Sequence, residues 1–278
     1  MSSDILPVIV LYKQPLCETT TYKTLLAESG LFFYVYDNSP EPVCQPAPQT
    51  FFYVHDPQNS GVSRAYNTAA GYAHEHGYRW LLLLDQDTSF PPDSLRQYQA
   101  AIAAHPDIRL FAPELTLEGD IPFSPVRYFC KTGHRIRLKR GTTYQLPGIA
   151  PVNSGVLIAL ELFENTGGYN EKVRLDFADF QFMETVARQE QNFFLLDVRA
   201  IQSFREGLPP LSAALTRYAI YLECAKACPR HSPADRIAFF YVVTRRALSL
   251  TWQYGHSDFL KVLFREYLCR TGKRNFPA

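Results

Sequence analysis

Residues 80–87 read WLLLLDQD, an apolar run of one tryptophan and four leucines that leads directly into two acids flanking a glutamine. The apolar part is typical of a strand buried on both faces of a sheet. Packing gives no reason for Asp85 and Asp87, so these acids either end the strand in a turn or hold something positively charged. Because residues two apart on an extended chain point the same way, both carboxylates are directed to one side.

Similar apolar runs recur over the first 112 residues and alternate with segments of helical composition. The predicted strands are residues 6–12, 31–37, 51–56, 79–85 and 108–113, and the predicted helices are residues 19–29, 63–77 and 93–105. A threonine caps the first helix and Asp93 the third, while Gly30 and Gly77 end the first and second. This alternation predicts an α/β fold with a mostly parallel, Rossmann-like sheet flanked by helices.

The remainder of the chain follows a different pattern. HRIRLKRG (134–141) alternates apolar and charged residues, as in a solvent-facing hairpin strand. The elements predicted after it are strands at 151–160 and 192–197 and a helix at 176–191. From about residue 210 the composition is helical throughout. We therefore predict an α/β domain over residues 1–205 and a C-terminal helical extension over residues 206–278.

The composition is that of an ordinary globular protein, with 46% hydrophobic residues, 20% charged residues and a formal net charge of +1. A charge this small argues against nucleic acid as a partner. The six cysteines are scattered without a C-x-x-C pair, which favours reduced thiols and a cytoplasmic location. We expect neither a secretory signal nor a membrane span, which needs about 20 apolar residues.

Polar clusters follow three of the predicted strands, where ligands of parallel sheets bind. These are Asp37-Asn38-Ser39, DPQNSGVSRAYN (56–67) and Asp85-Gln86-Asp87. Two acids held close repel each other unless a cation joins them, and carboxylate and diphosphate oxygens suit Mg²⁺ or Mn²⁺. The pair therefore predicts a metal site. A turn before Pro91 is the alternative for either acid alone.

The stretch NSGVSRAYN (59–67) places Gly61 and Ser63 at the start of a predicted helix. Free N–H groups and the helix dipole favour an anion there, and Arg64 could contact a phosphate. An ordinary capped helix is the alternative interpretation.

Asp176 and Asp179 stand three residues apart at the start of another predicted helix. They either cap the helix or place a carboxylate in the crevice, where Asp179 could act as a general base. Asp179, Met183 and Val186 share one helix face, so the second interpretation holds if that face packs inward. The residues alone leave both interpretations open.

Taken in order, these stretches resemble the inverting family 2 glycosyltransferases with a GT-A fold, and most closely their rhamnosyltransferase-like branch. The motifs are YVYDNS (34–39), NSGVSRAYN (59–67), LLLLDQDTSFPPDSL (81–95), NSGVLIALELFENTGGYNE (153–171) and LDFADFQF (175–182). The resemblance covers about residues 6–200. It implies a nucleotide-binding half over about residues 1–112 and a half for the donor sugar and acceptor over about residues 113–205.

The resemblance also assigns roles to individual residues. Asp85 and Asp87 match the DXD motif, which binds the donor diphosphate through a divalent metal, Mg or Mn. Asp179 aligns with the catalytic base and Asp176 with the acid that precedes it. The residues implied to contact the nucleotide sugar are Asp37, Asn38, Asn59, Gly61, Arg64, Asn67, Asp85, Gln86, Asn153 and Ser154.

The implied reaction moves a hexosyl or deoxyhexosyl group from a nucleotide-diphospho-sugar to a hydroxyl of a saccharide or lipid-linked acceptor, in the synthesis of cell-surface polysaccharide. Asp179 takes the proton of the hydroxyl in one direct displacement that inverts the anomeric carbon. The branch favours a deoxyhexose donor such as dTDP-rhamnose.

Two departures from the family pattern leave alternatives open. Gln181 stands where the family prefers an acid, and Ser203 or Phe204 stands where the branch has a histidine. Both favour, as an alternative, a weak or inactive sugar-nucleotide-binding protein of the same fold. A sugar nucleotidyltransferase is a further alternative, but YKQPLCETTT (12–21) lacks the glycine-rich loop of those enzymes.

The end of the chain, FLKVLFREYLCRTGKRNF (259–276), combines apolar residues at helical spacing with interleaved lysines and arginines. We expect this segment to dock on its own domain. Contact with anionic lipid at the inner face of a membrane, where a lipid-linked acceptor would lie, is the alternative.

Overall fold

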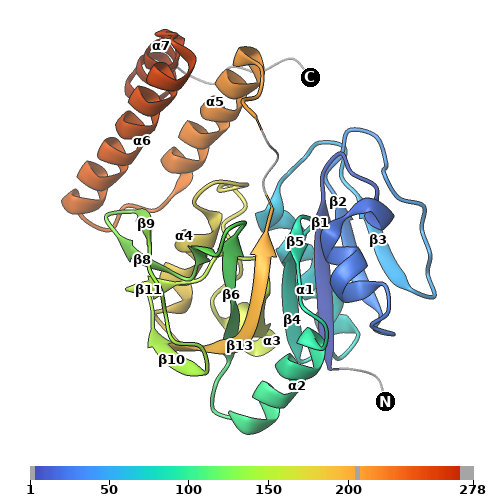
Figure 1. Cartoon of the computed structure of the whole chain (residues 1–278). Helices are drawn as coiled ribbons and strands as arrows, with labels where there is room; N and C mark the ends of the chain where they lie inside the picture. The colour runs from blue at the N-terminus through green and yellow to red at the C-terminus, as the bar shows by residue number, and fades with distance from the viewer. Residues whose placement is uncertain (1–3, 204–206, 270–278) are drawn as a thin grey trace.

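The computed structural model describes residues 4–203 and 207–269, and its centre is a ten-stranded sheet (Figure 1). The strand order is β10-β13-β6-β12-β4-β1-β2-β3, with β5 beside β13 and β7 beside β6. The strands are β1 (Ile5–Leu11), β2 (Phe33–Asp37), β3 (Phe51–His55), β4 (Trp80–Asp85), β5 (Thr88–Ser89), β6 (Leu110–Leu117), β7 (Ile121–Ser124), β10 (Thr142–Gln145), β12 (Val156–Ala159) and β13 (Asn192–Gln202).

The predicted mostly parallel α/β sheet is confirmed. Strands β4, β1, β2 and β3 pair in parallel, as do β6 and β13. Strand β12 runs antiparallel to both of its neighbours, β4 and β6, and the short strands β5, β7 and β10 also pair antiparallel. The parallel strands therefore end at one edge of the sheet, and the C-terminal helices stand over that edge (Figure 1).

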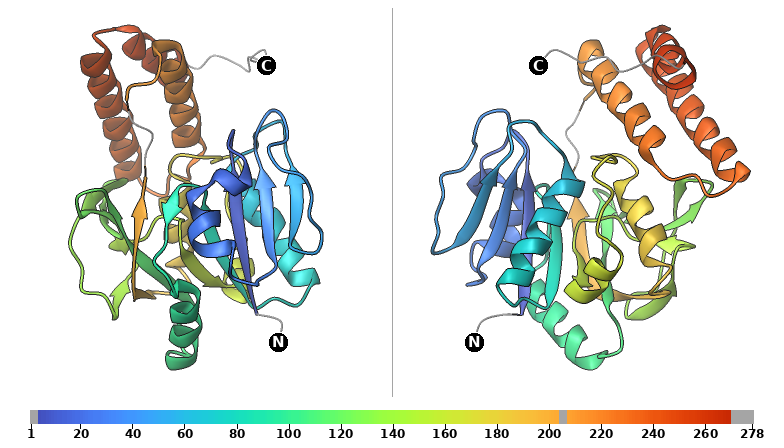
Figure 2. Two further views of the ribbon diagram at one scale, coloured as in Figure 1. Left: turned by 45° about the vertical axis from the view of Figure 1, so that its right-hand side comes forward. Right: turned by 180° about the vertical axis from the view of Figure 1, so that it is seen from behind.

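Both faces of the sheet are buried, which explains the four consecutive leucines of β4. Leu81 and Leu83 pack on one face, against α1 (Val62–Glu75), α3 (Leu160–Asn165) and α4 (Ala178–Val186). Leu82 and Leu84 pack on the other face, with α2 (Ser94–Ala104) and the short π-helix η2 (Tyr22–Leu26). From behind, α1 and α4 lie in front of the sheet (Figure 2).

Several predicted elements are shorter than expected. The helix predicted at 19–29 is reduced to η2, which the 3₁₀ turn η1 (Leu16–Glu18) precedes, and the helix predicted at 176–191 spans only α4. Asp93 is the residue before α2, but its side chain makes no capping hydrogen bond and instead pairs with Arg96 at 3.3 Å. The predicted cap is therefore wrong.

The hairpin strand predicted at 134–141 is also wrong. Strand β9 (Thr132–Arg135) ends before most of that stretch and pairs with β8 (Val126–Phe129), which pairs with β11 (Ile149–Ala150) in a separate three-stranded sheet. The charges after β9 make ion pairs instead of alternating along a strand. Arg137 binds Asp120 at 3.1 Å, and Arg140 binds Asp197 at 2.8 Å.

The C-terminal section consists of α5 (Leu211–Ala227), α6 (Pro233–Tyr254), α7 (Asp258–Val262) and the π-helix η3 (Leu263–Leu268). Ser232 and Asp235 form a reciprocal capping box at the start of α6. Phe259 and Leu263 are buried, so this part of the C-terminal segment docks on the protein as expected. The last three basic residues of the segment, Arg270, Lys273 and Arg274, lie outside the described residues. Within the described part of the chain, no helix has the length and apolar character needed to cross a bilayer.

A buried ion cluster ties the small sheet to the helices. Lys131, at the turn before β9, donates to Glu184 of α4 at 2.6 Å and lies 3.2 Å from Asp235 of α6. Only 9% of the Lys131 side chain is exposed. Burial lowers the pKa of Lys131, but its contacts with Glu184 and Asp235 outweigh burial and raise the pKa above its ordinary value.

Replacement of Lys131 by methionine should lower the stability by about 2 kcal/mol, because two partly buried acids lose their cation. For a chain of this size that corresponds to a melting temperature lower by roughly 4–8 °C, measured by differential scanning calorimetry. The matched control is Lys23→Met, on an exposed position of η2. Equal melting temperatures for both variants would contradict a stabilising role for the cluster.

Candidate active site

The polar segments after β1, β2 and β4 meet at the edge where these strands end. In the sheet register Leu11 lies beside Asp37, and Val10 beside Asp85. Two adjoining hollows open there. We call the first, of about 440 Å³, the strand-end hollow, and the second, of about 530 Å³, the helix-side hollow. The residues common to both are Val62, Asp85, Phe123, Val152, Leu175, Asp179 and Arg217.

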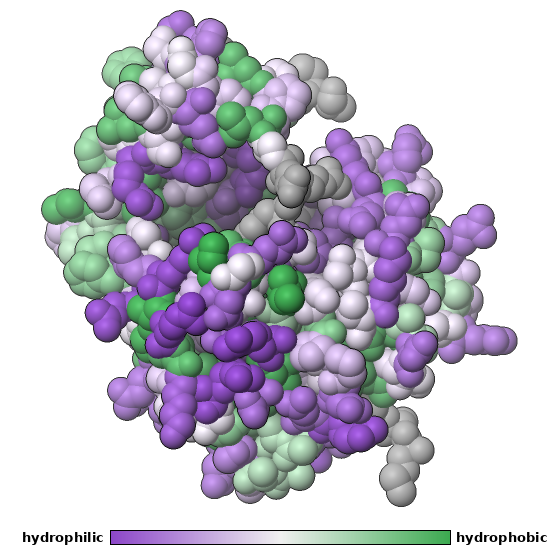
Figure 3. Space-filling view, in the orientation of Figure 1, coloured by the Kyte–Doolittle hydropathy of each residue, from purple (hydrophilic) through white to green (hydrophobic). Residues whose placement is uncertain are grey.

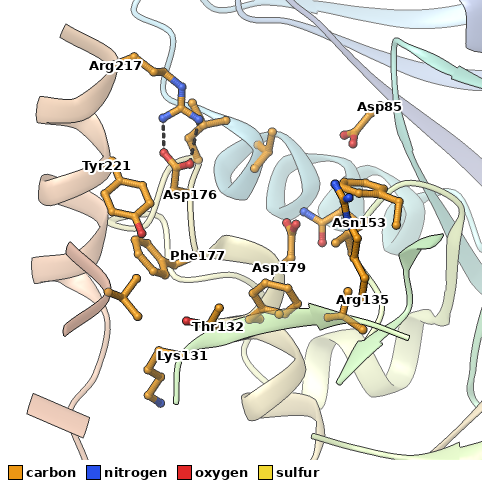
Figure 4. A pocket seen from close by; sticks show the side chains of 18 of the residues that line it. Asp85, Lys131, Thr132, Arg135, Asn153, Asp176, Phe177, Asp179, Arg217 and Tyr221 are labelled. Atoms are coloured by element: carbon orange, nitrogen blue, oxygen red, sulfur yellow. Dashed lines mark hydrogen bonds and ion pairs between the residues drawn. The ribbon is translucent and has the colours of Figure 1, made fainter. Parts of the chain in front are cut away.

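Three acids share this space, as Figure 4 shows for Asp85 and Asp179. Asp85 and Asp179 line both hollows, and Asp87 lines the strand-end hollow. Burial, and then the nearby charges of Asp87 and Asp179, raise the pKa of Asp85 to about 8, although the Tyr66 hydroxyl opposes the shift. The fold thus brings three acidic side chains from different segments to one space.

The positions of Asp85 and Asp87 depend on hydrogen bonds from other elements. The Ser154 hydroxyl lies 3.3 Å from the backbone N–H of Asp85 and accepts its hydrogen bond. Gln202, the last residue of β13, donates to the Asp87 carboxylate and accepts a 2.6 Å hydrogen bond from Thr88. The segment after β4 is therefore fixed by the end of β13, far away in sequence.

Asp179 enters the helix-side hollow from the first turn of α4. Asn153 lies beside it in Figure 4 and hydrogen-bonds to it. The Asn153 amide oxygen accepts a 2.6 Å hydrogen bond from Tyr169, which fixes the orientation of the amide. Burial, and then Asp176, raise the pKa of Asp179 to about 7, whereas the hydrogen bond from Asn153 lowers it. A carboxylate with this pKa can accept a proton near neutral pH.

Asp176 is held by the helical section. Arg217 of α5 donates through both terminal nitrogens to the two carboxylate oxygens, with Nη2 at 2.9 Å from Oδ1 (Figure 4). Such a two-point contact fixes the carboxylate plane as well as its position. The contact links α5 to the segment that leads into α4 and Asp179.

Five of the sequence-predicted nucleotide contacts line the strand-end hollow. They are Asn38, Asn59, Gly61, Asp85 and Gln86. Gly61 has φ +94°, and a Cβ on it would lie 2.0 Å from the carbonyl oxygen of Arg174, so only glycine fits. Gln86 exchanges hydrogen bonds with the backbone N–H and carbonyl of Tyr12, which orders the loop after β1.

Four other predicted residues line neither hollow: Asp37, Arg64, Asn67 and Ser154. Asp37 is buried and accepts hydrogen bonds from the N–H groups of Ser39 and Val43, both at 2.9 Å. Asn67 binds the backbone of Tyr169 on both sides of its amide. These side chains shape the loops around the hollows.

The start of α1 is covered by protein. The N–H of Val62 donates to the Arg174 carbonyl at 2.9 Å, and the Ser63 hydroxyl donates to the Val173 carbonyl. Arg64 points outward and is exposed. The segment before α4 thus covers the start of α1, where the sequence predicted an anion site.

Sequence reasoning missed four residues of this region: Tyr66, Tyr169, Gln202 and Arg217. Tyr66 and Tyr169 are buried beneath the acids, with ring centroids 5.4 Å apart. Tyr66 occurs within the quoted motif NSGVSRAYN and Tyr169 within NSGVLIALELFENTGGYNE, which were the available signals. Gln202 and Arg217 carry no local signal, because their partners lie 115 and 41 residues away.

The two departures from the family pattern can now be placed. Gln181 lines neither hollow, and its amide bonds within α4 to Thr185 at 3.1 Å. At the other position, the N–H of Ser203 donates to the Asp87 carbonyl at 3.1 Å, whereas Phe204 lies outside the described residues. Among the described residues of this segment, Gln202 is the one whose side chain hydrogen-bonds to Asp87.

The donor set fits a divalent cation that shares its coordination with a substrate. Asp85 and Asp87 offer hard oxygen ligands, and the pKa of Asp85 is raised by burial and then by the neighbouring acids, whose repulsion a cation would relieve. Among the residues described, no group of three or more histidine, cysteine or acidic side chains forms a complete protein cage. Mg²⁺ characteristically binds through one or two carboxylates together with substrate phosphates.

Comparison with known proteins finds similarity to glycosyltransferases. Residues 35–155 match the sequence model described as Glycosyl transferase family 2. The dTDP-rhamnosyl transferase RfbF of Shigella flexneri is 23% identical over 187 residues, which cover 66% of this chain and 62% of that protein. Residues 35–155 are thus similar to a family 2 glycosyltransferase domain. It spans less than two thirds of the length of that curated relative.

Solved structures share the fold of this chain. GalNAc-T7, solved with UDP, GalNAc and Mn²⁺, has a TM-score of 0.54 at 13% identity, covering 78% of this chain and 48% of that one. Residues 1–349 of TarS from S. aureus, in complex with UDP, give a TM-score of 0.51 at 12% identity, covering 90% of this chain and 72% of that one. The expected GT-A fold is confirmed, and the family match favours a glycosyltransferase over a sugar nucleotidyltransferase.

Replacement of Arg217 by glutamine should loosen the segment before α4. Amide hydrogen exchange of residues 174–180 is expected to accelerate about tenfold, equivalent to about 1.4 kcal/mol, because one charged two-point contact is lost. The matched control is Arg109→Gln, which removes the partly exposed pair with Glu190 elsewhere in the domain. Unchanged exchange in the Arg217 variant would show that α5 does not order this segment.

Proposed function

We propose that this chain transfers a sugar from a nucleotide-diphospho-sugar to an acceptor hydroxyl, with inversion at the anomeric carbon. The observation that carries the proposal is that Asp85, Asp87 and Asp179 border one continuous space although they come from different elements. Two of these acids can bind a cation together with its diphosphate, and the third can act as a proton acceptor. Both tasks belong to a single transfer reaction.

The nucleotide would occupy the strand-end hollow. Asn38, Asn59 and Gly61 line its far side, and Gln86 and Asp87 line the side nearer the acids. Asp85 and Asp87 would hold a divalent cation, Mg or Mn, together with the diphosphate. When bound, that cation supplies positive charge that stabilises the departing nucleoside diphosphate.

The acceptor would enter from the helix-side hollow, toward which Asp179 points. Its hydroxyl oxygen attacks the anomeric carbon, the bond from that carbon to the diphosphate oxygen breaks, and Asp179 takes the proton. Asn153 orients the Asp179 carboxylate through its hydrogen bond. Because attack and departure occur on opposite faces of one carbon, the configuration inverts without an enzyme nucleophile.

The proposed donor is a deoxyhexose nucleotide such as dTDP-rhamnose, since the relative at 23% identity is named a dTDP-rhamnosyl transferase. The proposed acceptor is a saccharide, either free or lipid-linked, of the kind from which cell-surface polysaccharide is built. A lipid-linked acceptor would bring the enzyme to the inner face of a membrane.

The Asp179→Asn variant tests the assignment of the base. We expect kcat for release of dTDP from dTDP-rhamnose, in the presence of Mn²⁺ and a saccharide acceptor, to fall about 10²–10⁴-fold. The dissociation constant of the donor should change less than about threefold. Asp107→Asn, which alters an exposed acid far from the hollows, is the control and should match the wild type.

The pH profile gives the same assignment a second readout. A base must be deprotonated, and the pKa of Asp179 is raised to about 7, so wild-type kcat/KM should rise with pH and level off above about 7. The residual activity of the asparagine variant should lack that rise. Tight donor binding without turnover on any acceptor would instead favour an inactive nucleotide-sugar-binding protein.

A further inference from the structure

A third hollow, of about 480 Å³, lies between α5 and α6 next to the helix-side hollow. We call it the arginine hollow, because Arg217, Arg245 and Arg246 line it. It shares Asp176, Arg217, Tyr221 and Arg245 with the helix-side hollow, so the two spaces are continuous. In Figure 3 a recess with hydrophilic walls separates the helices at the top from the body of the molecule.

The arginine hollow has an excess of positive charge. Its one acidic lining residue, Asp176, already accepts both hydrogen bonds from Arg217. Arg245 and Arg246 make no salt bridge with any acid among residues 4–203 and 207–269, whereas many other arginines of the protein do. Two arginines that line one hollow, and that no described carboxylate pairs with, are suited to a phosphate or diphosphate group.

This charge is separate from the site proposed for the donor diphosphate. Neither Arg245 nor Arg246 lines the strand-end hollow, which contains Asp87 and Gln86. Arg245 does line the helix-side hollow, on the same space as Asp179. The arginine hollow therefore adjoins the acceptor side of the candidate active site.

Resting on the proposed function, we infer that the arginine hollow binds a phosphate or diphosphate group of the acceptor while the acceptor's sugar hydroxyl lies beside Asp179. The phosphate group itself does not react. The energy of its binding in the arginine hollow serves to orient the reacting sugar hydroxyl. Arg217 has a different role here, because it is already committed to Asp176.

Two sources could supply such a group: a lipid-linked diphosphate saccharide or a water-soluble saccharide phosphate. Helix α6 bears on its solvent side four large exposed apolar residues, Ile237, Tyr241, Leu248 and Trp252. Their spacing puts them on one helix face. This apolar face and the two arginines belong to the same helix, so the test includes an arm for each source.

The direct test measures binding of inorganic pyrophosphate by isothermal titration calorimetry in EDTA, which removes any metal-dependent binding at Asp85 and Asp87. The test variant is Arg245→Gln/Arg246→Gln, and the control is Arg236→Gln/Lys226→Gln, which removes the same charge from exposed positions on α6 and α5. We expect the pyrophosphate dissociation constant to weaken at least tenfold in the test variant and to stay within about twofold in the control. Equal affinities in the two variants would overturn the inference.

The kinetic arms identify the source of the phosphate. With a polyprenyl-diphosphate-linked saccharide in detergent and with a soluble saccharide 1-phosphate, the test variant should raise the KM for at least one acceptor about tenfold or more. The KM for an uncharged saccharide should be the same in the test and control variants. An equal KM increase for charged and uncharged acceptors would reject a phosphate site.

These outcomes are distinguishable from failure of the proposed function. Binding of dTDP with Mn²⁺ uses the strand-end hollow and should stay within about twofold in the test variant. If the wild type binds no nucleotide with Mn²⁺ but its pyrophosphate affinity depends on Arg245 and Arg246, the proposed function fails while the anion site stands. If nucleotide binds and the two arginines make no difference to pyrophosphate, the anion site fails alone.

Discussion

Electrostatic repulsion among three carboxylates is the constraint on which the rest of the site depends. Asp85, Asp87 and Asp179 border one space. Burial, and then the charges of Asp87 and Asp179, raise the pKa of Asp85, whereas burial, and then Asp176, raise the pKa of Asp179. An arrangement of this kind lowers the stability of the folded chain and persists only where the surrounding structure enforces it. Such a loss of stability is expected of a site in which two acids bind a cation and a third accepts a proton.

The fold enforces this proximity with contacts that come from distant parts of the chain. Gln202 at the end of β13 fixes Asp87, Tyr169 fixes Asn153 beside Asp179, and Arg217 of α5 fixes Asp176. The C-terminal helices are therefore part of the site, since they supply Arg217, Tyr221 and Arg245 to the wall of the helix-side hollow. Two of the arginines that line the helix-side hollow, Arg217 and Arg245, come from these helices.

The sequence was informative where structure depends on local pattern. Continuous apolar runs predicted every parallel strand from β1 to β6, because strands buried on both faces leave that pattern. The segments after β2 and β4 and the start of α4 were predicted to meet, and they do so because parallel strands end at a common edge. What could not be predicted depends on tertiary structure. The antiparallel direction of β12 leaves no mark on its composition, and the partners of Gln202 and Arg217 lie far away in sequence. Likewise, the sequence does not show that the Arg174 carbonyl covers the start of α1. For that reason it predicted a phosphate contact for Arg64 there.

Anomalous diffraction from crystals grown with Mn²⁺ and dTDP tests the central claim most directly. The account predicts one manganese peak within about 2.5 Å of a carboxylate oxygen of Asp85 or Asp87 and in contact with the diphosphate, with Asp179 in the same space but not a ligand. A nucleotide bound with manganese at some other group of side chains, or bound there without any metal between it and these two acids, would contradict it.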